Sequence, residues 1–276
     1  MINVFTRKQN ISYFDSVNEY INYLEDTPRA PGHDDDSEST SQNGWTGTKS
    51  LKEALDLCKY GDEKLGTYVY NQVLKISRID TVNKNRQAYI NDIVGFTPNV
   101  PNYVMGIPTN MIRDNRNIIK SKIINIYINL SAHAGVNSDD IKRNAAKYVS
   151  AINQLEKEGY RCNVYTGNVA DTWENDEYAV IVKVKSDREP LNLVKMAFPL
   201  CHPSMLRRLA FKWIETIPID FTHRGYGRPV DDEKKVKKLI EPILGNRQIT
   251  ILSIGHDCGN VDNVVNQLKE RGMVEE

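Results

Sequence analysis

The stretch that decides the fold runs from Lys122 to Gly167 and reads KIINIYINLSAHAGVNSDDIKRNAAKYVSAINQLEKEGYRCNVYTG. Residues 123–130 are almost all apolar, which is typical of a strand that is buried on both faces of a sheet. Residues 138–159 then place apolar side chains at helical spacing, with acidic residues at the start and a glycine at the end. A second apolar run begins at Cys162. The pattern predicts a strand–helix–strand unit.

The rest of the chain extends this unit. The apolar run 178–184 follows without an intervening helix, so we expect it to pair antiparallel with the strand before it. Apolar and polar spacing then predicts two helices, a last strand and a last helix, in the order 203–214, 232–240, 249–254 and 261–272. We therefore predict an α/β fold, a Rossmann-like mixed sheet flanked by helices, with a smaller helical N-terminal region.

Composition divides the chain into four predicted regions. They are an N-terminal helix (1–30), an acidic flexible linker (31–43), a helical region with a Pro-rich extended segment (44–117) and the α/β domain (118–276). Ser16 with Glu19, and Ser50 with Glu53, have the spacing of capping boxes and so mark two helix starts.

The bulk composition is that of a globular protein. The 276 residues include 36 basic and 36 acidic side chains, and the pI is about 7.0, which argues against binding nucleic acid by net charge alone. No apolar run is long enough to span a bilayer, so we expect no membrane partner. Four cysteines lie far apart with no CxxC pair, which favours reduced thiols and a cytoplasmic location.

The loop after the first strand of the α/β domain is the first candidate site. In open α/β sheets, ligands bind at the carboxyl ends of the strands. Asn129, Ser131 and His133 lie there, and Asp257 follows the last strand. These four residues are a candidate partner or ion site. The alternative is a set of polar caps that binds nothing.

The order of elements, with the segment Asn129-Leu130-Ser131-Ala132-His133, resembles a von Willebrand factor A-like domain. That family places a metal at an Asp-x-Ser-x-Ser motif and at a later Asp. Ser131 matches the motif, Asn129 and His133 depart from it, and Asp257 stands where the later Asp would fall. The resemblance implies the scaffold with a degenerate site. Divalent metal is the alternative, but no cofactor is expected, because the first carboxylate is missing.

The front half of the chain carries a second resemblance. The segments GWTGTKSLKEALDLCKYG (44–61) and NVPNYVMGIPTNM (99–111) look like parts of uncharacterised bacteriophage-encoded proteins. This resemblance implies that the protein acts in the host cell cytoplasm. It implies no activity.

An arginine–aromatic–glycine cluster is the second candidate site. Loops of this composition can contact a nucleic-acid backbone and stack a base. The residues are Arg207, Arg208, Arg224, Tyr226 and Arg228. The alternative is a solvated loop that pairs with the acidic residues 231–233. Lys234, Lys235, Lys237 and Lys238 are interpreted as a solvated helix face.

Two cysteine–histidine pairs and one tryptophan remain. Cys201 with His202, and His256 with Cys258, are candidates for zinc ligands or a nucleophilic pair, although buried structural cysteines are the alternative. Trp45 is either a partner anchor or a buried residue packed on the next helix.

The sequence has no P-loop, GxGxxG, HExxH or GxSxG motif, and the absence of these motifs counts against an enzymatic function. The leading hypothesis is a non-enzymatic accessory protein that binds a protein partner through its strand-end loops. The second is a single-stranded nucleic-acid-binding cofactor of phage transcription or replication. The third is a metal-dependent hydrolase.

Overall fold

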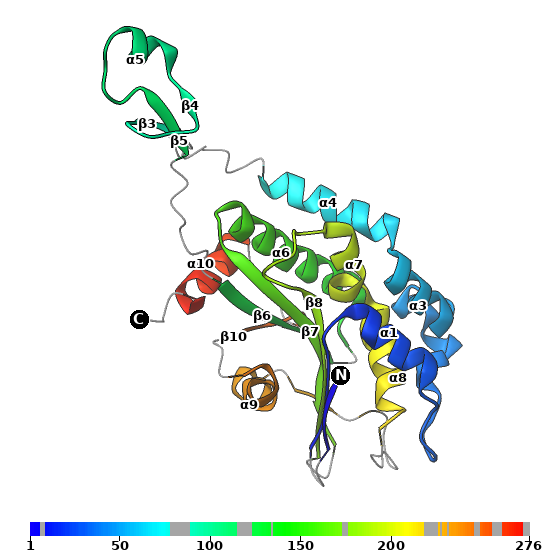
Figure 1. The fold of residues 1–276 in the computed structure, drawn as a ribbon. Helices are drawn as coiled ribbons and strands as arrows, with labels where there is room; N and C mark the ends of the chain where they lie inside the picture. Colours follow the sequence, from blue (N-terminus) through cyan, green and yellow to red (C-terminus); the bar gives the residue numbers. More distant parts are fainter. Residues whose placement is uncertain are drawn as a thin grey trace. The chain divides into compact units, whose positions relative to one another are not determined.

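The computed structural model describes residues 1–5, 9–77, 89–114, 123–133, 135–172, 176–217, 226, 228–230, 232–245, 249–255 and 261–272. The chain forms two compact units (Figure 1). The main unit comprises Met1–Ser77 and Lys122–Glu276, and the inserted unit comprises Arg78–Ser121. Each unit is described by itself below.

The main unit is built on one mixed sheet. Its strands lie in the order β1 (Ile2–Phe5), β2 (Gln9–Phe14), β8 (Glu177–Lys185), β7 (Arg161–Asp171), β6 (Ile123–Asn129) and β10 (Ile249–Ser253), and β9 (Arg228–Pro229) pairs with β7. The pairs β6–β7, β6–β10 and β2–β8 are parallel. The pairs β7–β8, β1–β2 and β7–β9 are antiparallel. The predicted α/β class with a mixed sheet is confirmed.

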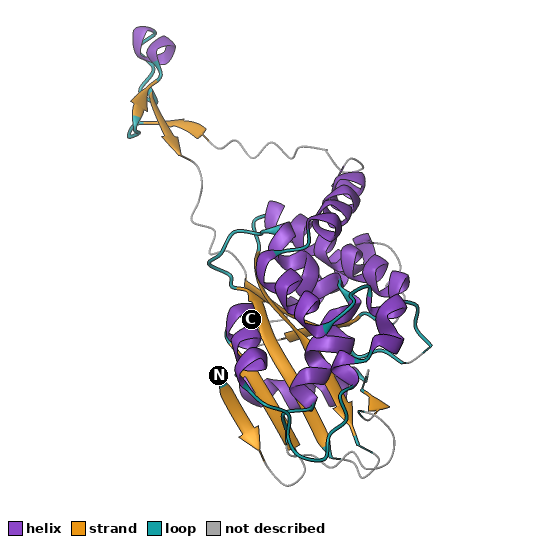
Figure 2. Ribbon diagram, turned by 90° about the vertical axis from the view of Figure 1, so that its right-hand side faces the viewer, coloured by secondary structure: helices purple, strands orange, loops and turns teal. Residues whose placement is uncertain are grey.

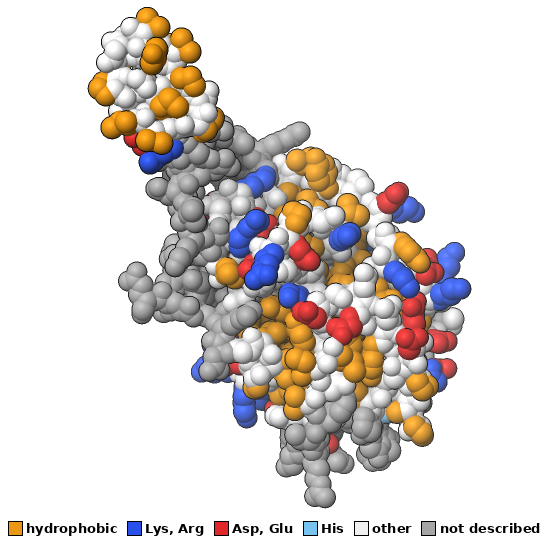
Figure 3. Space-filling model, viewed as in Figure 1, with side chains coloured by type: hydrophobic (Ala, Val, Ile, Leu, Met, Phe, Trp, Pro, Cys, Tyr) orange, Lys and Arg blue, Asp and Glu red, His pale blue; other side chains and the backbone are white. Residues whose placement is uncertain are grey.

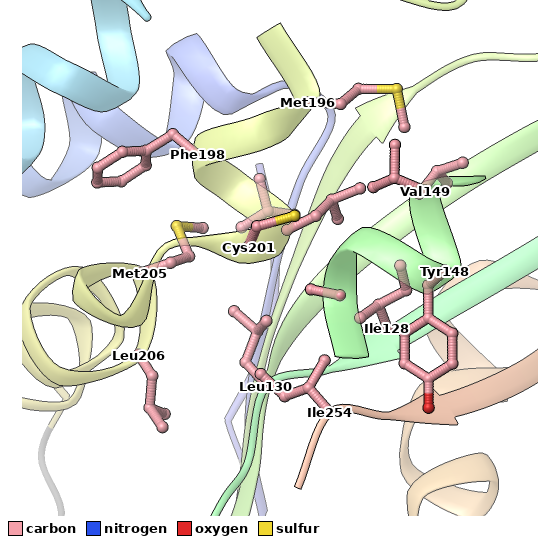
Figure 4. Close-up of a cluster of buried hydrophobic side chains, with 14 of the residues drawn as sticks. Ile128, Leu130, Tyr148, Val149, Met196, Phe198, Cys201, Met205, Leu206 and Ile254 are labelled. Atoms are coloured by element: carbon pink, nitrogen blue, oxygen red, sulfur yellow. The ribbon is translucent and has the colours of Figure 1, made fainter. Parts of the chain in front are cut away.

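Helices cover both faces of this sheet (Figures 1 and 2). The larger core lies between one face and α1 (Val17–Asp26), α3 (Leu51–Tyr60), α4 (Glu63–Ser77), α6 (Ser138–Lys157), α7 (Leu193–Cys201), the π-helical segment η3 (Met205–Ala210), α8 (Phe211–Ile214) and α10 (Val261–Gly272). The smaller core lies between the other face and α9 (Glu233–Leu244). Figure 4 shows side chains of the larger core, including Ile128 of β6 and Val149 of α6.

Strand β6, which lies between β7 and the edge strand β10, explains the apolar run in the sequence. Ile126 and Ile128 enter the larger core, whereas Tyr127 enters the smaller one, because successive side chains point to opposite faces. All three are fully buried. The following helix α6 is capped by the side chain of Asn137, which accepts a hydrogen bond from Asp139 N.

The front of the chain belongs to the same sheet, which the sequence did not predict. Strands β1 and β2 precede the predicted helix, and β2 pairs with β8. Both predicted capping boxes form: Glu19 N donates to Ser16 Oγ and Glu53 N donates to Ser50 Oγ, each over 3.1 Å. Helices α3 and α4 also pack into the larger core.

Residues 31–43 differ from the flexible linker that their composition predicts. They include the short 3-10 helices η1 (Asp36–Glu38) and η2 (Thr40–Gln42), and α2 (Asn43–Thr46) follows directly. Ser37 is fully buried, and its N–H and Oγ–H each donate to the Glu215 carboxylate over 2.8 Å. A buried carboxylate needs such donors, and this need orders the acidic segment.

The inserted unit has its own three-stranded sheet. The strands are β3 (Tyr89–Asp92), β5 (Met111–Asp114) and β4 (Thr97–Pro98), in that order, and α5 (Val100–Val104) lies between β4 and β5 in the chain. A Cβ at Gly95 would lie 2.2 Å from Ile112 O, so only glycine fits this close approach. This segment therefore folds back on itself, whereas we expected an extended path within a single 44–117 region.

Candidate functional site

The first candidate site lies at the carboxyl end of β6, and its polar groups bind the protein's own backbone. Asn129 Nδ2 donates to Val230 O over 2.7 Å, and Asn129 Oδ1 accepts from Ser131 N. Ser131 Oγ lies 2.7 Å from Asn168 Oδ1 and 2.6 Å from Val169 O, and it accepts from Val169 N. Asn129 and Ser131 are both buried. They tie β6 to β7 and to the segment after β9.

The other two residues of this candidate site differ from the first pair. His133 is exposed. Asp257 lies outside the described residues, so the structure does not place it beside Ser131. The predicted clustering of the four residues therefore stays a prediction.

The described residues of this site do not fit a divalent cation. Such a cation favours several free oxygen ligands, with carboxylates among them. Here the Asn129 amide and the Ser131 hydroxyl already bind neighbouring backbone and side-chain groups. Across the described part of the chain, no three His, Cys, Asp or Glu side chains gather as a metal site would require.

The Cys201–His202 pair is built into the core. Cys201 is fully buried among apolar side chains (Figure 4), and burial raises the pKa of its thiol well above the usual value. Burial lowers the pKa of His202 to about 4. The imidazole stacks on Phe198, and its Nδ1 accepts from Ser204 N over 3.1 Å. A protonated thiol is a poor nucleophile and a poor zinc ligand. His256 and Cys258 lie outside the described residues.

The second candidate site contains an arginine that is buried. Arg208 is 1% exposed, and its guanidinium donates to Thr48 Oγ1 and O, to Ser37 O and to Asn43 Oδ1. The four contacts span 2.6–3.0 Å. Arg208 thus joins η3 to the segment 37–48 and cannot reach a phosphate in solution.

Arg207 packs between two aromatic rings. Its guanidinium carbon lies 5.1 Å from the Trp45 ring centre and 5.3 Å from the Phe211 ring centre, which is cation–π geometry. Trp45 Nε1 donates to Val136 O over 2.9 Å. Trp45 is half-buried and packs against the larger core, whereas the alternative interpretation expected it buried on the next helix, and it connects α2 to the loop before α6.

The remaining described residues of the second site also contact the protein itself. The Tyr226 hydroxyl donates to Glu215 Oε1 over 2.8 Å, and its ring meets Phe211 edge to face. Arg228 Nε donates to Asp171 Oδ1 over 2.9 Å. Arg224 lies outside the described residues. The described members do not form an open basic surface. They therefore do not support the predicted nucleic-acid site.

The inserted unit carries a surface that the sequence interpretation missed. Seven apolar side chains between residues 93 and 105 are each 61–77% exposed, and Figure 3 shows apolar side chains over this unit. They are Ile93, Val94, Phe96, Val100, Tyr103, Val104 and Met105. None of the described residues 90–113 is buried. We call residues 93–107 the apolar tip.

The polar groups of the apolar tip are bonded within the unit. The Asn99 side chain accepts from Asn102 N and donates to Asn91 Oδ1, and Asn102 Nδ2 donates to Thr109 O. Backbone bonds join Phe96 N to Ile112 O and Ile107 N to Asn102 O. The tip therefore presents apolar side chains on a backbone whose hydrogen bonds are largely made.

Comparison with known proteins assigns a family to the chain. The model of a domain of unknown function, DUF7192, matches residues 3–275. The chain belongs to the DUF7192 family. No curated protein and no solved structure matches this DUF7192 chain significantly. In the described part of the DUF7192 chain, no helix is both long and apolar enough to cross a bilayer.

Proposed function

We propose that this protein is a non-enzymatic accessory protein that binds a protein partner through the apolar tip. The observation that carries the proposal is the exposure of seven large apolar side chains between residues 93 and 105. Soluble proteins rarely expose contiguous apolar patches of this kind unless the patch is an interaction surface.

The small size of the inserted unit supports the same proposal. A three-stranded sheet needs a packed apolar face for independent stability. The described residues 90–113 include no buried side chain, so the unit has no core of its own there. A partner that covers the apolar tip would supply the missing burial, at about 25 cal/mol for each Å² of apolar surface removed from water.

The proposal moves the binding surface from the strand-end loops to the inserted unit. Asn129 and Ser131, which we expected to face a partner, bind the protein's own backbone instead. The main unit then serves as the carrier of the inserted unit. The chain order β6, α6, β7, β8, β10 and α10, with antiparallel β7 and β8, supports the von Willebrand A-like scaffold as part of this proposal. The phage origin of the protein, proposed from sequence resemblance, and its cytoplasmic location, proposed from that resemblance and from the separated cysteines, remain part of the proposal.

A comparative capture experiment tests the proposal. Full-length protein, the double variant Val100→Lys with Val104→Lys and the control Tyr60→Lys are immobilised in equal amounts and exposed to a nuclease-treated extract of the producing cells. Tyr60 is 78% exposed on α3 of the main unit, so its substitution matches the tip variant in chemistry. We expect proteins that are retained by wild type and Tyr60→Lys and lost with the double variant. Equal retention of the same proteins by all three would show that the apolar tip does not bind the partner.

A further inference from the structure

We infer that the apolar tip binds the apolar tip of a second copy of this chain, about a two-fold axis that passes by Val104. The inference rests on the proposed function, because it names the partner of the same surface. Val104 is the most exposed of the seven apolar residues, at 77%.

Helix α5 presents its apolar side away from its own unit. Val100, Tyr103 and Val104 stand at positions i, i+3 and i+4, which share one helix face, and all three are more than 60% exposed. A helix that served only its own fold would bury such a stripe against the sheet. Helix-to-helix packing of this stripe with its symmetry mate would bury it instead.

The tip is built to keep its shape when it is covered. Asn99 caps α5, and Asn102 bonds the backbone at Thr109, so these side chains hold the loop from within. Gly106 takes the left-handed conformation at φ +69°, where a side chain would be strained, and ends the helical turn. These local bonds define the shape of the loop backbone, and the second copy supplies the apolar burial that the unit lacks; both favour association.

The absence of charge favours an uncharged protein surface, such as the tip of a second copy, over a nucleic acid or a bilayer. Residues 93–112 contain no Asp, Glu, Lys, Arg or His, so two tips meet without repulsion. The nearest charged side chains, Asp92 and Arg113, pair with each other over 2.9 Å. A bilayer surface holds short apolar insertions mainly with the help of adjacent cationic residues; residues 93–112 contain none, and the adjacent Arg113 is paired with Asp92. A nucleic acid binds through cationic side chains that neutralise its phosphates, and residues 93–112 contain none.

The area is sufficient for a dimer. Burying a Val, Ile, Phe or Met side chain removes roughly 60–120 Å² of apolar surface. Six such residues and Tyr103 therefore offer on the order of 600 Å² from each copy, and the backbone and Ile107 add to this. A standard specific interface buries about 800 Å² on each partner. The tip comes close to that value without any contribution from the main unit.

Sedimentation velocity of the full-length chain tests the inference with a pair of charge variants. Wild type is compared with Val104→Lys, Val104→Glu, an equal mixture of these two, and the control Tyr60→Lys. An isologous contact repeats each substitution across the axis, so each variant alone places like charges opposite each other. Since Val104 is exposed, neither substitution disturbs the fold of a single copy.

We expect wild type and Tyr60→Lys to dimerise, with a dissociation constant in the micromolar range or below. Each Val104 variant alone should weaken the dimer by about 100-fold or more, and the mixture should restore a heterodimer. The wild-type dimer should persist when NaCl rises from about 0.1 to about 0.5 M, because apolar contacts are not screened.

Three results would overturn the inference. One is a wild-type protein that stays monomeric up to about 100 µM, well above the expected dissociation constant. Another is a dimer that both single variants retain, which would place the contact elsewhere. The third is a monomer that sediments with phosphatidylcholine–phosphatidylglycerol vesicles in a Val104-dependent manner, which would make a bilayer the occupant. If self-association fails while the double variant Val100→Lys with Val104→Lys still loses captured proteins, the proposed function stands and only the second copy falls.

Discussion

Arg208 illustrates why residue type and spacing did not predict a role correctly. In the sequence it is one of two adjacent arginines in a basic stretch, and we expected both to face a nucleic acid. In the structure its acceptors come from Ser37, Asn43 and Thr48, more than 150 residues away. The burial of this arginine depends on those distant contacts, and the sequence around Arg208 does not show them.

We predict that Arg208→Met destabilises the protein by at least about 3 kcal/mol, because it leaves several buried acceptors unsatisfied. Urea denaturation measures the change. The matched control is Arg228→Met. The Arg228 side chain is 41% exposed and pairs with Asp171, so its loss should cost less than about 1 kcal/mol. Equal losses for the two variants would contradict the buried role of Arg208.

His202 should make stability depend on pH. Its pKa is about 4 in the folded chain, against 6.5 for an ordinary histidine, so the unfolded chain takes up the proton first as the pH falls. This contribution is complete above pH 6.5 and is lost between about pH 6.5 and 4, by about 3 kcal/mol. Thermal or urea denaturation at several pH values in this window measures it. His202→Gln should flatten the profile over the same window; an unchanged slope would show that other groups cause it.

At the scale of elements, the sequence was most informative where one segment carried a complete pattern. The apolar run of β6 and the amphipathic face of α6 predicted both elements, and the absence of a helix before β8 predicted its antiparallel pairing with β7. Strands β1 and β2 were missed. They are short, and their pairing depends on β8, which lies far along the chain. Such pairing is a tertiary property that local propensity does not record.

The burial of β6 between β7 and β10 yields a direct prediction. Ile126→Ala and Ile128→Ala should each destabilise the protein by roughly 2–5 kcal/mol, because both side chains are fully buried in the larger core. Chemical denaturation measures the loss. Ile123→Ala is the control, since Ile123 begins the same strand but is 50% exposed, and its substitution should change stability by about 0.5 kcal/mol or less. A midpoint unchanged in the two buried variants would argue against the burial of β6.

The acidic segment 31–43 shows a limit of composition as a guide to order. Its Asp, Ser and Thr residues are typical of a mobile linker. The buried Glu215 carboxylate nevertheless binds Ser37, and the same carboxylate accepts from Tyr226. The Glu215 carboxylate thus binds two residues, Ser37 and Tyr226, that were predicted to lie in solvated segments. Nothing in the sequence around Glu215 marks this residue as buried.

At the scale of the whole molecule, the chain interrupts one domain with another. We predicted a boundary near residue 118, but the sheet joins residues before 78 to residues after 122. The prolines and glycines of 93–113 predicted an extended path, whereas the segment contains β4, α5 and β5. The apolar surface of this segment carries no charged or polar motif of the kind that marks a site in a sequence. The informative signal was the absence of charge from 93 to 112 in a segment with many large apolar residues.

The central claim is that the apolar tip is a protein-docking surface. The most direct test places a photoreactive p-benzoylphenylalanine at position 103 of the full-length chain, in place of the exposed Tyr103, and irradiates cells that produce it. The same residue at position 60, in place of Tyr60, is the control on the main unit. We predict a covalent adduct with polypeptide from position 103 and little from position 60. No adduct at position 103, equal adducts at both positions, or adducts with lipid or nucleic acid alone would contradict the account.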